Sequence, residues 1–200
     1  MSLNAITIKL GEVLTLKRGY DLTSINRGSG KVPVYSSSGL SGYHTEFKVK
    51  GPGVVTGRYG TLGEVFYSEK DFWPHNTTLY VKDFKGNHPK YIFYFLKTLG
   101  FNNQNDKTSV PGVNRNHLHE LKVKFIPDLP TQTRIASILS TLDDKIALNR
   151  RTNHTLEQMA QTLFKKYFVD DIDLNSSVEC SLLDFATLLS GGTPKTDNPA

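Results

Sequence analysis

The sequence has one cysteine, Cys180, among its 200 residues. A single thiol cannot form an internal disulfide, and its surroundings lack the spacing of a structural metal site. The apolar runs are far shorter than the roughly 18 to 20 residues that cross a bilayer, and the first residues lack the basic and apolar pattern of a signal peptide. These absences predict a soluble, cytoplasmic protein with no contact to a membrane.

Catalytic motifs are also missing. We find no glycine fingerprint for a dinucleotide or for AdoMet, no Asn-Pro-Pro-aromatic motif of an adenine methyltransferase and no nuclease carboxylate cluster. Gly57, Gly60 and Gly63 lack the Gly-Lys-Ser/Thr ending of a phosphate loop, so we interpret them as tight turns. His117 and His119 alternate as on a strand edge but have no third ligand, which disfavours zinc. The sequence predicts no catalytic centre, metal or cofactor in this chain.

The charge is unevenly distributed. Hydrophobic residues make up 38% of the chain, enough for one sizeable core, and the net charge is +5. Residues 1–128 hold 17 Lys and Arg against 10 Asp and Glu, residues 129–169 hold 6 against 3, and residues 170–200 hold 1 against 6. A basic body suits a phosphate-binding surface, although many basic proteins bind no nucleic acid.

Residues 1–128 have the pattern of an α/β (α+β) domain with a mixed sheet. Turn-forming residues separate short strands, which we expect at 32–35, 53–56, 64–67, 78–81 and 121–125. Helices are expected at 11–17 and 90–99. The aromatic residues of the second helix have helical spacing, which favours core packing over stacking on bases.

A long helix is predicted from about residue 131 to 168, where glycine and proline are absent. At 1.5 Å per residue it would extend roughly 57 Å, farther than one small domain needs. Its heptad positions form an apolar seam interrupted by two asparagines, typical of a coiled coil: Ile135, Leu139, Leu142, Ile146, Asn149, Asn153, Leu156, Ala160, Leu163 and Tyr167. The seam predicts a partner helix; the alternative is a helix that lies across its own domain.

Residues 170–200 begin with an acidic segment that we interpret as a linker. A weak repeat follows, in which Leu10, Val13, Leu16 and Gly19 recur 173 positions later as Leu183, Ala186, Leu189 and Gly192. These matches suggest the start of a second, incomplete copy of the basic domain.

Several segments together resemble the DNA specificity subunit of type I restriction-modification systems. They are Arg18–Leu22, Pro33-Val34 with Ser36 and Gly39, Gly57–Gly63, Trp73–Tyr80, Asn114–Asn116, Arg134–Leu139, Leu142–Ile146, Asn149–Arg151 and Leu163–Phe168. Thr131 departs from the pattern, because a glutamate often precedes the glutamine.

The resemblance implies two α/β target recognition domains joined by two long antiparallel helices. This sequence supplies one of each, so it looks like a half-subunit or a fragment, whose dimerisation through the helix would restore the two-domain form. The implied partners are double-stranded DNA, a methyltransferase subunit that uses AdoMet, and an ATP-driven, Mg²⁺-dependent endonuclease subunit. The alternative function is a stand-alone coiled-coil interaction protein that has lost its DNA specificity.

The candidate DNA contacts are side chains suited to guanine, adenine or phosphate in expected loops. They are Lys17, Arg18, Arg27, Lys31, Ser36, Ser37, Ser38, Tyr43, Arg58, Lys107, Ser109, Asn114 and Arg115. For each one, a role as a turn residue or a solvated charge is the alternative.

Overall fold

The computed structural model describes residues 4–23, 25, 27–58, 63–99, 114–171, 180–187, 189 and 191. Contacts divide the chain into two units, Met1–Lys145 and Ile146–Ala200. The first unit contains β1 (Ile6–Lys9), α1 (Leu10–Val13), β2 (Thr15–Arg18), β3 (Val32–Ser36), β4 (Gly39–His44), β5 (Gly53–Gly57), β6 (Val65–Ser68), β7 (Trp73–Pro74), β8 (Thr78–Asp83), α2 (Pro89–Thr98), α3 (Arg115–Glu120) and β9 (Lys122–Phe125). Helix α4 (Leu129–Lys165) begins in the first unit and continues into the second.

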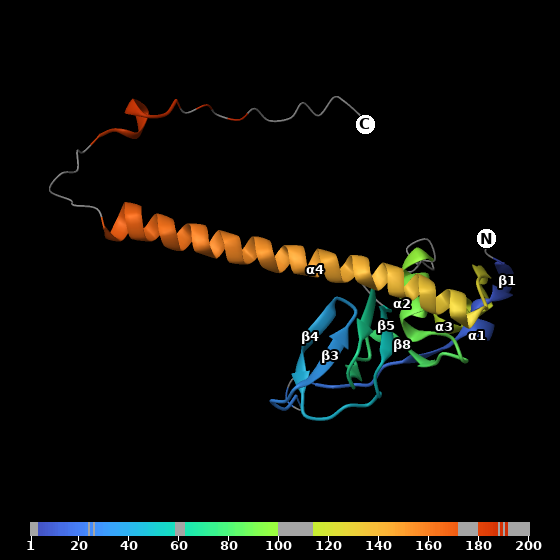
Figure 1. Ribbon diagram of the computed structural model, residues 1–200. Helices are drawn as coiled ribbons and strands as arrows, with labels where there is room; N and C mark the ends of the chain where they lie inside the picture. The colour runs from blue at the N-terminus through green and yellow to red at the C-terminus, as the bar shows by residue number, and fades with distance from the viewer. Residues whose placement is uncertain are drawn as a thin grey trace. The chain divides into compact units, whose positions relative to one another are not determined.

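Among the described residues of the first unit, the strands form three small sheets (Figure 1). The largest has the antiparallel order β2-β8-β5-β6. In the second, of order β4-β3-β7, strands β3 and β4 form a hairpin and β7 pairs parallel to β3. Strands β1 and β9 form an antiparallel pair. The predicted α+β class with mixed strand directions is confirmed.

The main core lies between the large sheet and the helices. Residues of β2, β5, β6 and β8 pack with α1, α2, the one buried residue of α3, and Ala136 of α4. The aromatic residues of α2 belong to this core, as their spacing predicted: Tyr91, Phe93 and Phe95 are buried. A smaller aromatic group around Tyr20, Phe72 and Trp73 fills the space between the large sheet and the hairpin.

Local assignments differ from the sequence prediction in three respects. The helix expected at 11–17 is a single turn, α1, followed by strand β2. The apolar spacing is helical there, but Leu16 pairs with Val81 of β8, so tertiary pairing overrides the local pattern. His117 and His119 lie on helix α3, not on a strand edge. Strands β1, β4 and β7 were also not predicted, because they are short or rich in glycine and polar residues.

The first turns of α4 are fixed to the domain by a buried polar network. The side chain of Gln132 is fully buried; its Oε1 accepts the N–H of His88 at 2.9 Å, and its Nε2 donates to Asn87 Oδ1 and to the Ile126 carbonyl, both at 2.8 Å. Farther along, the Tyr94 hydroxyl donates to Asp143 Oδ2 at 2.8 Å. Side-chain hydrogen bonds at Gln132 and at Asp143 therefore attach the first part of the helix to the domain.

The later turns of α4 leave their apolar side chains exposed. Ile135 packs against the domain core and Leu139 is half-buried, whereas Leu142 and Leu156 are each 56% exposed. The helix ends in a π-helical segment, η2 (Lys166–Asp170), and a 3-10 turn, η4 (Leu182–Asp184), follows. Among the described residues, no helix is long and apolar enough to span a membrane.

Candidate functional site

The turn His75–Thr77, between β7 and β8, ties together the ends of three strands. On the β2 side, the Tyr20 N–H donates to the Pro74 carbonyl at 2.8 Å. On the β3 side, the His75 N–H donates to the Tyr35 carbonyl at 2.8 Å. On the β5 side, the Arg58 N–H donates to the Thr77 carbonyl at 2.9 Å. The turn and the residue before it, Pro74, therefore fix the positions of three segments that are distant in sequence.

Glycine makes this close approach possible at the end of β2. A Cβ at Gly19 would overlap the carbonyl oxygens of Pro74 and His75. A side chain at position 19 would clash with these oxygens and separate β2 from the turn. Glycine is therefore required here by close packing and not by its backbone dihedral angles.

We call the side chains gathered around this turn the turn edge. It contains Arg18, Asp21, Ser36, Ser37, Ser38, Arg58, His75, Asn76 and Thr77. Five of these were predicted as DNA contacts from the sequence: Arg18, the three serines and Arg58. The structure brings these five together, which their separation in sequence did not reveal. A duplex presents phosphates and base edges to such a group of hydroxyl, amide and guanidinium side chains.

Internal hydrogen bonds orient the polar groups of the turn edge. The hydroxyls of Ser36 and Ser38 are 3.0 Å apart, and the Ser37 N–H donates to Thr77 Oγ1 at 3.3 Å. His75 Nδ1 lies 3.2 Å from the same threonine oxygen. Because these contacts hold the turns in place, the hydroxyls of Ser36 and Ser38 have a defined direction before any ligand arrives.

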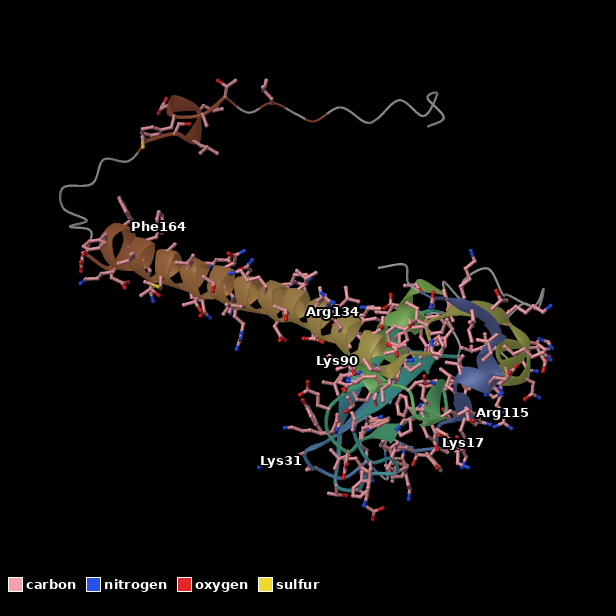
Figure 2. All side chains as sticks on the ribbon, turned by 45° about the vertical axis from the view of Figure 1, so that its right-hand side comes forward. Lys17, Lys31, Lys90, Arg115, Arg134 and Phe164 are labelled. Atoms are coloured by element: carbon pink, nitrogen blue, oxygen red, sulfur yellow. The ribbon has the colours of Figure 1, made fainter. Side chains whose placement is uncertain are left out.

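A second group lies beside β2 and α3. Lys17 Nζ lies 5.5 Å from the centre of the Tyr20 ring, and that ring stacks on Tyr80. Burial raises the pKa of Tyr80, whereas its hydrogen bond to Tyr20, followed by the charge of Lys17, lowers the pKa of Tyr20. The two hydroxyl oxygens lie 3.1 Å apart, and either one can donate the hydrogen bond. Figure 2 shows Lys17 and Arg115 on the same side of the domain.

His119 fixes α3 to this side. Its Nε2 accepts the Leu16 N–H at 2.9 Å, which requires a neutral ring. Burial, followed by the charges of Arg115 and Lys85, lowers the pKa of His119 and so keeps this nitrogen available as an acceptor. Asn114 caps the helix through its side chain, which accepts the N–H of Asn116 at 3.0 Å. The predicted candidate Asn114 thus has a structural contact of its own.

A third group lies along the β3–β4 hairpin. Arg27, Lys31 and Tyr43 line an open pocket of about 570 Å³, and Arg27 Nη1 donates to the Ser41 carbonyl at 2.8 Å. In Figure 2, Lys31 lies at the opposite edge of the domain from Lys17 and Arg115. The predicted contacts therefore form three separate groups. Lys107 and Ser109 lie outside the described residues.

Sequence reasoning missed Asp21, His75, Asn76 and Thr77. The segment Trp73–Tyr80 carried the resemblance, but nothing in it indicated that its turn meets three strand ends. Within the described ranges, no three His, Cys, Asp or Glu side chains lie close enough to hold a metal ion.

Comparison with known proteins assigns the family. The family model described as "Type I restriction modification DNA specificity domain" matches residues 4–158. The chain belongs to this family. The turn edge, the other two groups and most of α4 all lie within the match.

Curated specificity subunits match over shorter stretches. The chain is 60% identical over 45 residues to the HindI specificity subunit of Haemophilus influenzae, covering 22% of this chain and 10% of that protein. It is 29% identical over 85 residues to the MjaIX specificity subunit of Methanocaldococcus jannaschii, covering 40% of this chain and 19% of that protein.

Solved structures of specificity subunits share the fold. An S subunit from M. genitalium superimposes with a TM-score of 0.68 at 21% identity, covering 84% of this chain and 47% of that one. The HsdS subunit from Thermoanaerobacter tengcongensis superimposes with a TM-score of 0.55 at 15% identity, covering 86% of this chain and 46% of that one. The chain spans less than half the length of these two proteins.

Proposed function

We propose that this specificity-domain chain recognises a short DNA sequence on behalf of partner subunits and performs no chemistry itself. The observation that carries the proposal is the turn edge, where three strand ends present two arginines and three serines together. Family membership supports the same function. The basic groups around Lys17 and Lys31, at opposite edges of the domain, are further places where phosphates would make contact.

The long helix provides the second part of the proposal. Its seam from Leu142 to Leu163 is about half exposed in the single chain, with Ile146 at 48% and Leu163 at 53%. We expect this seam to pair with a second helix, from another copy of the chain or from a second half of the same subunit. The exposed Asn149 and Asn153 would fix the register of that pair at some cost in stability.

The expected partners supply the chemistry. A methyltransferase subunit with AdoMet would methylate adenine, and a translocating endonuclease subunit with ATP and Mg²⁺ would cleave, in the cytoplasm. The exposed seam is also what a stand-alone coiled-coil interaction protein would have. That alternative differs in one measurable respect, because its globular domain would ignore DNA.

Fluorescence anisotropy with a labelled duplex, measured from 50 to 200 mM salt, tests the proposal. If five cations contact phosphates, the slope of log K against log salt is about −4.5, which is a loss of a few hundred-fold over that range. Arg58→Ala should weaken binding, whereas Arg150→Ala, on an exposed part of α4, should not. A parent protein that pairs through its helix but shows no binding at low salt would contradict the proposal and favour the alternative.

A further inference from the structure

One carboxylate stands within the turn edge. The side chain of Asp21, 77% exposed, accepts a hydrogen bond from Asn76 Nδ2, and its Oδ1 lies 3.7 Å from Arg18 Nη2. Both contacts converge on Oδ1. Within the described part of the chain, the second oxygen, Oδ2, has no hydrogen-bond partner.

The fold does not depend on this carboxylate. Asp21 contacts the two side chains of Arg18 and Asn76, caps no helix, and forms no hydrogen bond to the backbone among the described residues. Exposed ion pairs contribute little to stability. Against phosphates, moreover, a negative charge is unfavourable at every distance. At a surface that binds DNA, Asp21 is therefore useful only where it faces a hydrogen-bond donor.

The donors that DNA presents in the major groove are the exocyclic amino groups of cytosine and adenine. The guanidinium of Arg18, beside the Asp21 carboxylate, has only hydrogen-bond donors and therefore needs acceptors on the DNA. In a G·C pair the guanine O6 and the cytosine N4 are hydrogen-bonded to each other, so an acceptor and a donor lie about 3 Å apart. Arg18 Nη2 lies 3.7 Å from Asp21 Oδ1, so the guanidinium donors stand beside a carboxylate whose Oδ2 is an acceptor without a partner among the described residues.

We propose that Arg18 and Asp21 together read one G·C base pair, with Arg18 on guanine and Asp21 on the cytosine amino group. The guanidinium fork finds two acceptors on guanine, O6 and N7, but only O4 on thymine, next to the methyl group, so an A·T pair fits less well. Asn76 is a positioning residue, because its amide holds the Asp21 carboxylate. This assignment rests on the proposed DNA recognition and adds the base that is read.

Selection from a randomised duplex library with the full chain, followed by sequencing, tests this assignment. The parent should select a motif that contains a G·C pair in one fixed orientation. Asp21→Asn removes the charge with almost no change in shape; it should lower the preference at that pair about tenfold, leave the other positions unchanged, and bind random duplex at least as tightly as the parent.

Glu69→Gln is the matched control. Glu69 is also 77% exposed and forms a comparable ion pair, 3.5 Å from Lys90 Nζ, at the opposite end of the large sheet from Arg58. This variant should select the parent's motif. As a second measurement, the affinity of the parent and Asp21→Asn for the selected duplex and for its A·T and C·G versions at that pair should show the same tenfold difference.

Three results would overturn the assignment while leaving DNA recognition in place. They are a motif that Asp21→Asn does not alter, a loss of preference spread evenly over all positions, and a loss confined to a pair other than G·C. A parent that selects no motif would contradict the proposed function itself, and with it the assignment, because no base would then be read.

Discussion

Replacing Gln132 with leucine should destabilise the domain without creating a large cavity, because the two side chains are similar in volume. The change removes one acceptor and two donor contacts at once, and leaves the His88 N–H, Asn87 Oδ1 and the Ile126 carbonyl without their partner. A partly buried polar group left unsatisfied costs about 1 kcal/mol at the lower end of the usual range. Three such groups give roughly 3 kcal/mol, a large share of the stability of a typical domain.

Urea denaturation measures this cost through the fluorescence of Trp73, the only tryptophan, which is buried against Tyr20 and His44. Gln161→Leu makes the same change at an exposed position of α4 and should leave the unfolding midpoint almost unchanged. If Gln132→Leu lies within about 0.5 kcal/mol of the parent, the network does not hold the helix and the reasoning is wrong.

Three further predictions concern α3, the turn edge and the seam. Because the folded chain keeps His119 below its ordinary pKa of 6.5, the unfolded chain binds the extra proton, so stability should fall as pH drops below about 6.5, by up to about 1.4 kcal/mol per pH unit. In a plot of the urea unfolding midpoint against pH, His119→Gln should reduce the slope below about pH 6.5, whereas His154→Gln should leave it unchanged. Equal slopes for the parent and His119→Gln would contradict this prediction. Gly19→Ala should cost about 1 to 3 kcal/mol by overpacking against the turn, and an unchanged thermal midpoint would contradict it. Leu142→Ala or Leu156→Ala should weaken self-association in analytical ultracentrifugation by on the order of 2 to 5 kcal/mol, and a parent that stays monomeric with no partner subunit bound would contradict the seam.

The sequence predicted the elements that have a strong local pattern. Helix α2 and helix α4 follow from apolar periodicity, and β5 and β8 follow from continuous β-branched or aromatic runs. Strand β4 was missed, because its sequence Gly39–His44 has glycine and serine where a strand usually has bulky residues. Its place in the sheet depends on pairing with β3, which local pattern does not report.

The candidate site, too, could be predicted only in part from the sequence. Residue type alone was enough to select Arg18, Arg58 and the serines, because arginine and hydroxyl groups suit DNA. It was not enough to select Asp21 or Asn76. Their importance comes from the meeting of β2 and the His75–Thr77 turn, which depends on hydrogen bonds between residues more than 50 positions apart.

Main-chain hydrogen bonds attach the three strand ends to the His75–Thr77 turn and to Pro74, which precedes it. They join Tyr20 to Pro74, His75 to Tyr35, and Arg58 to Thr77. Main-chain bonds do not depend on which side chain a position carries, so exposed residues such as Arg18, Asp21 and Ser38 can be exchanged while the frame that presents them stays in place. Under the proposed DNA recognition, a change of target sequence would then need only substitutions on a fixed scaffold, with Gly19 left unchanged.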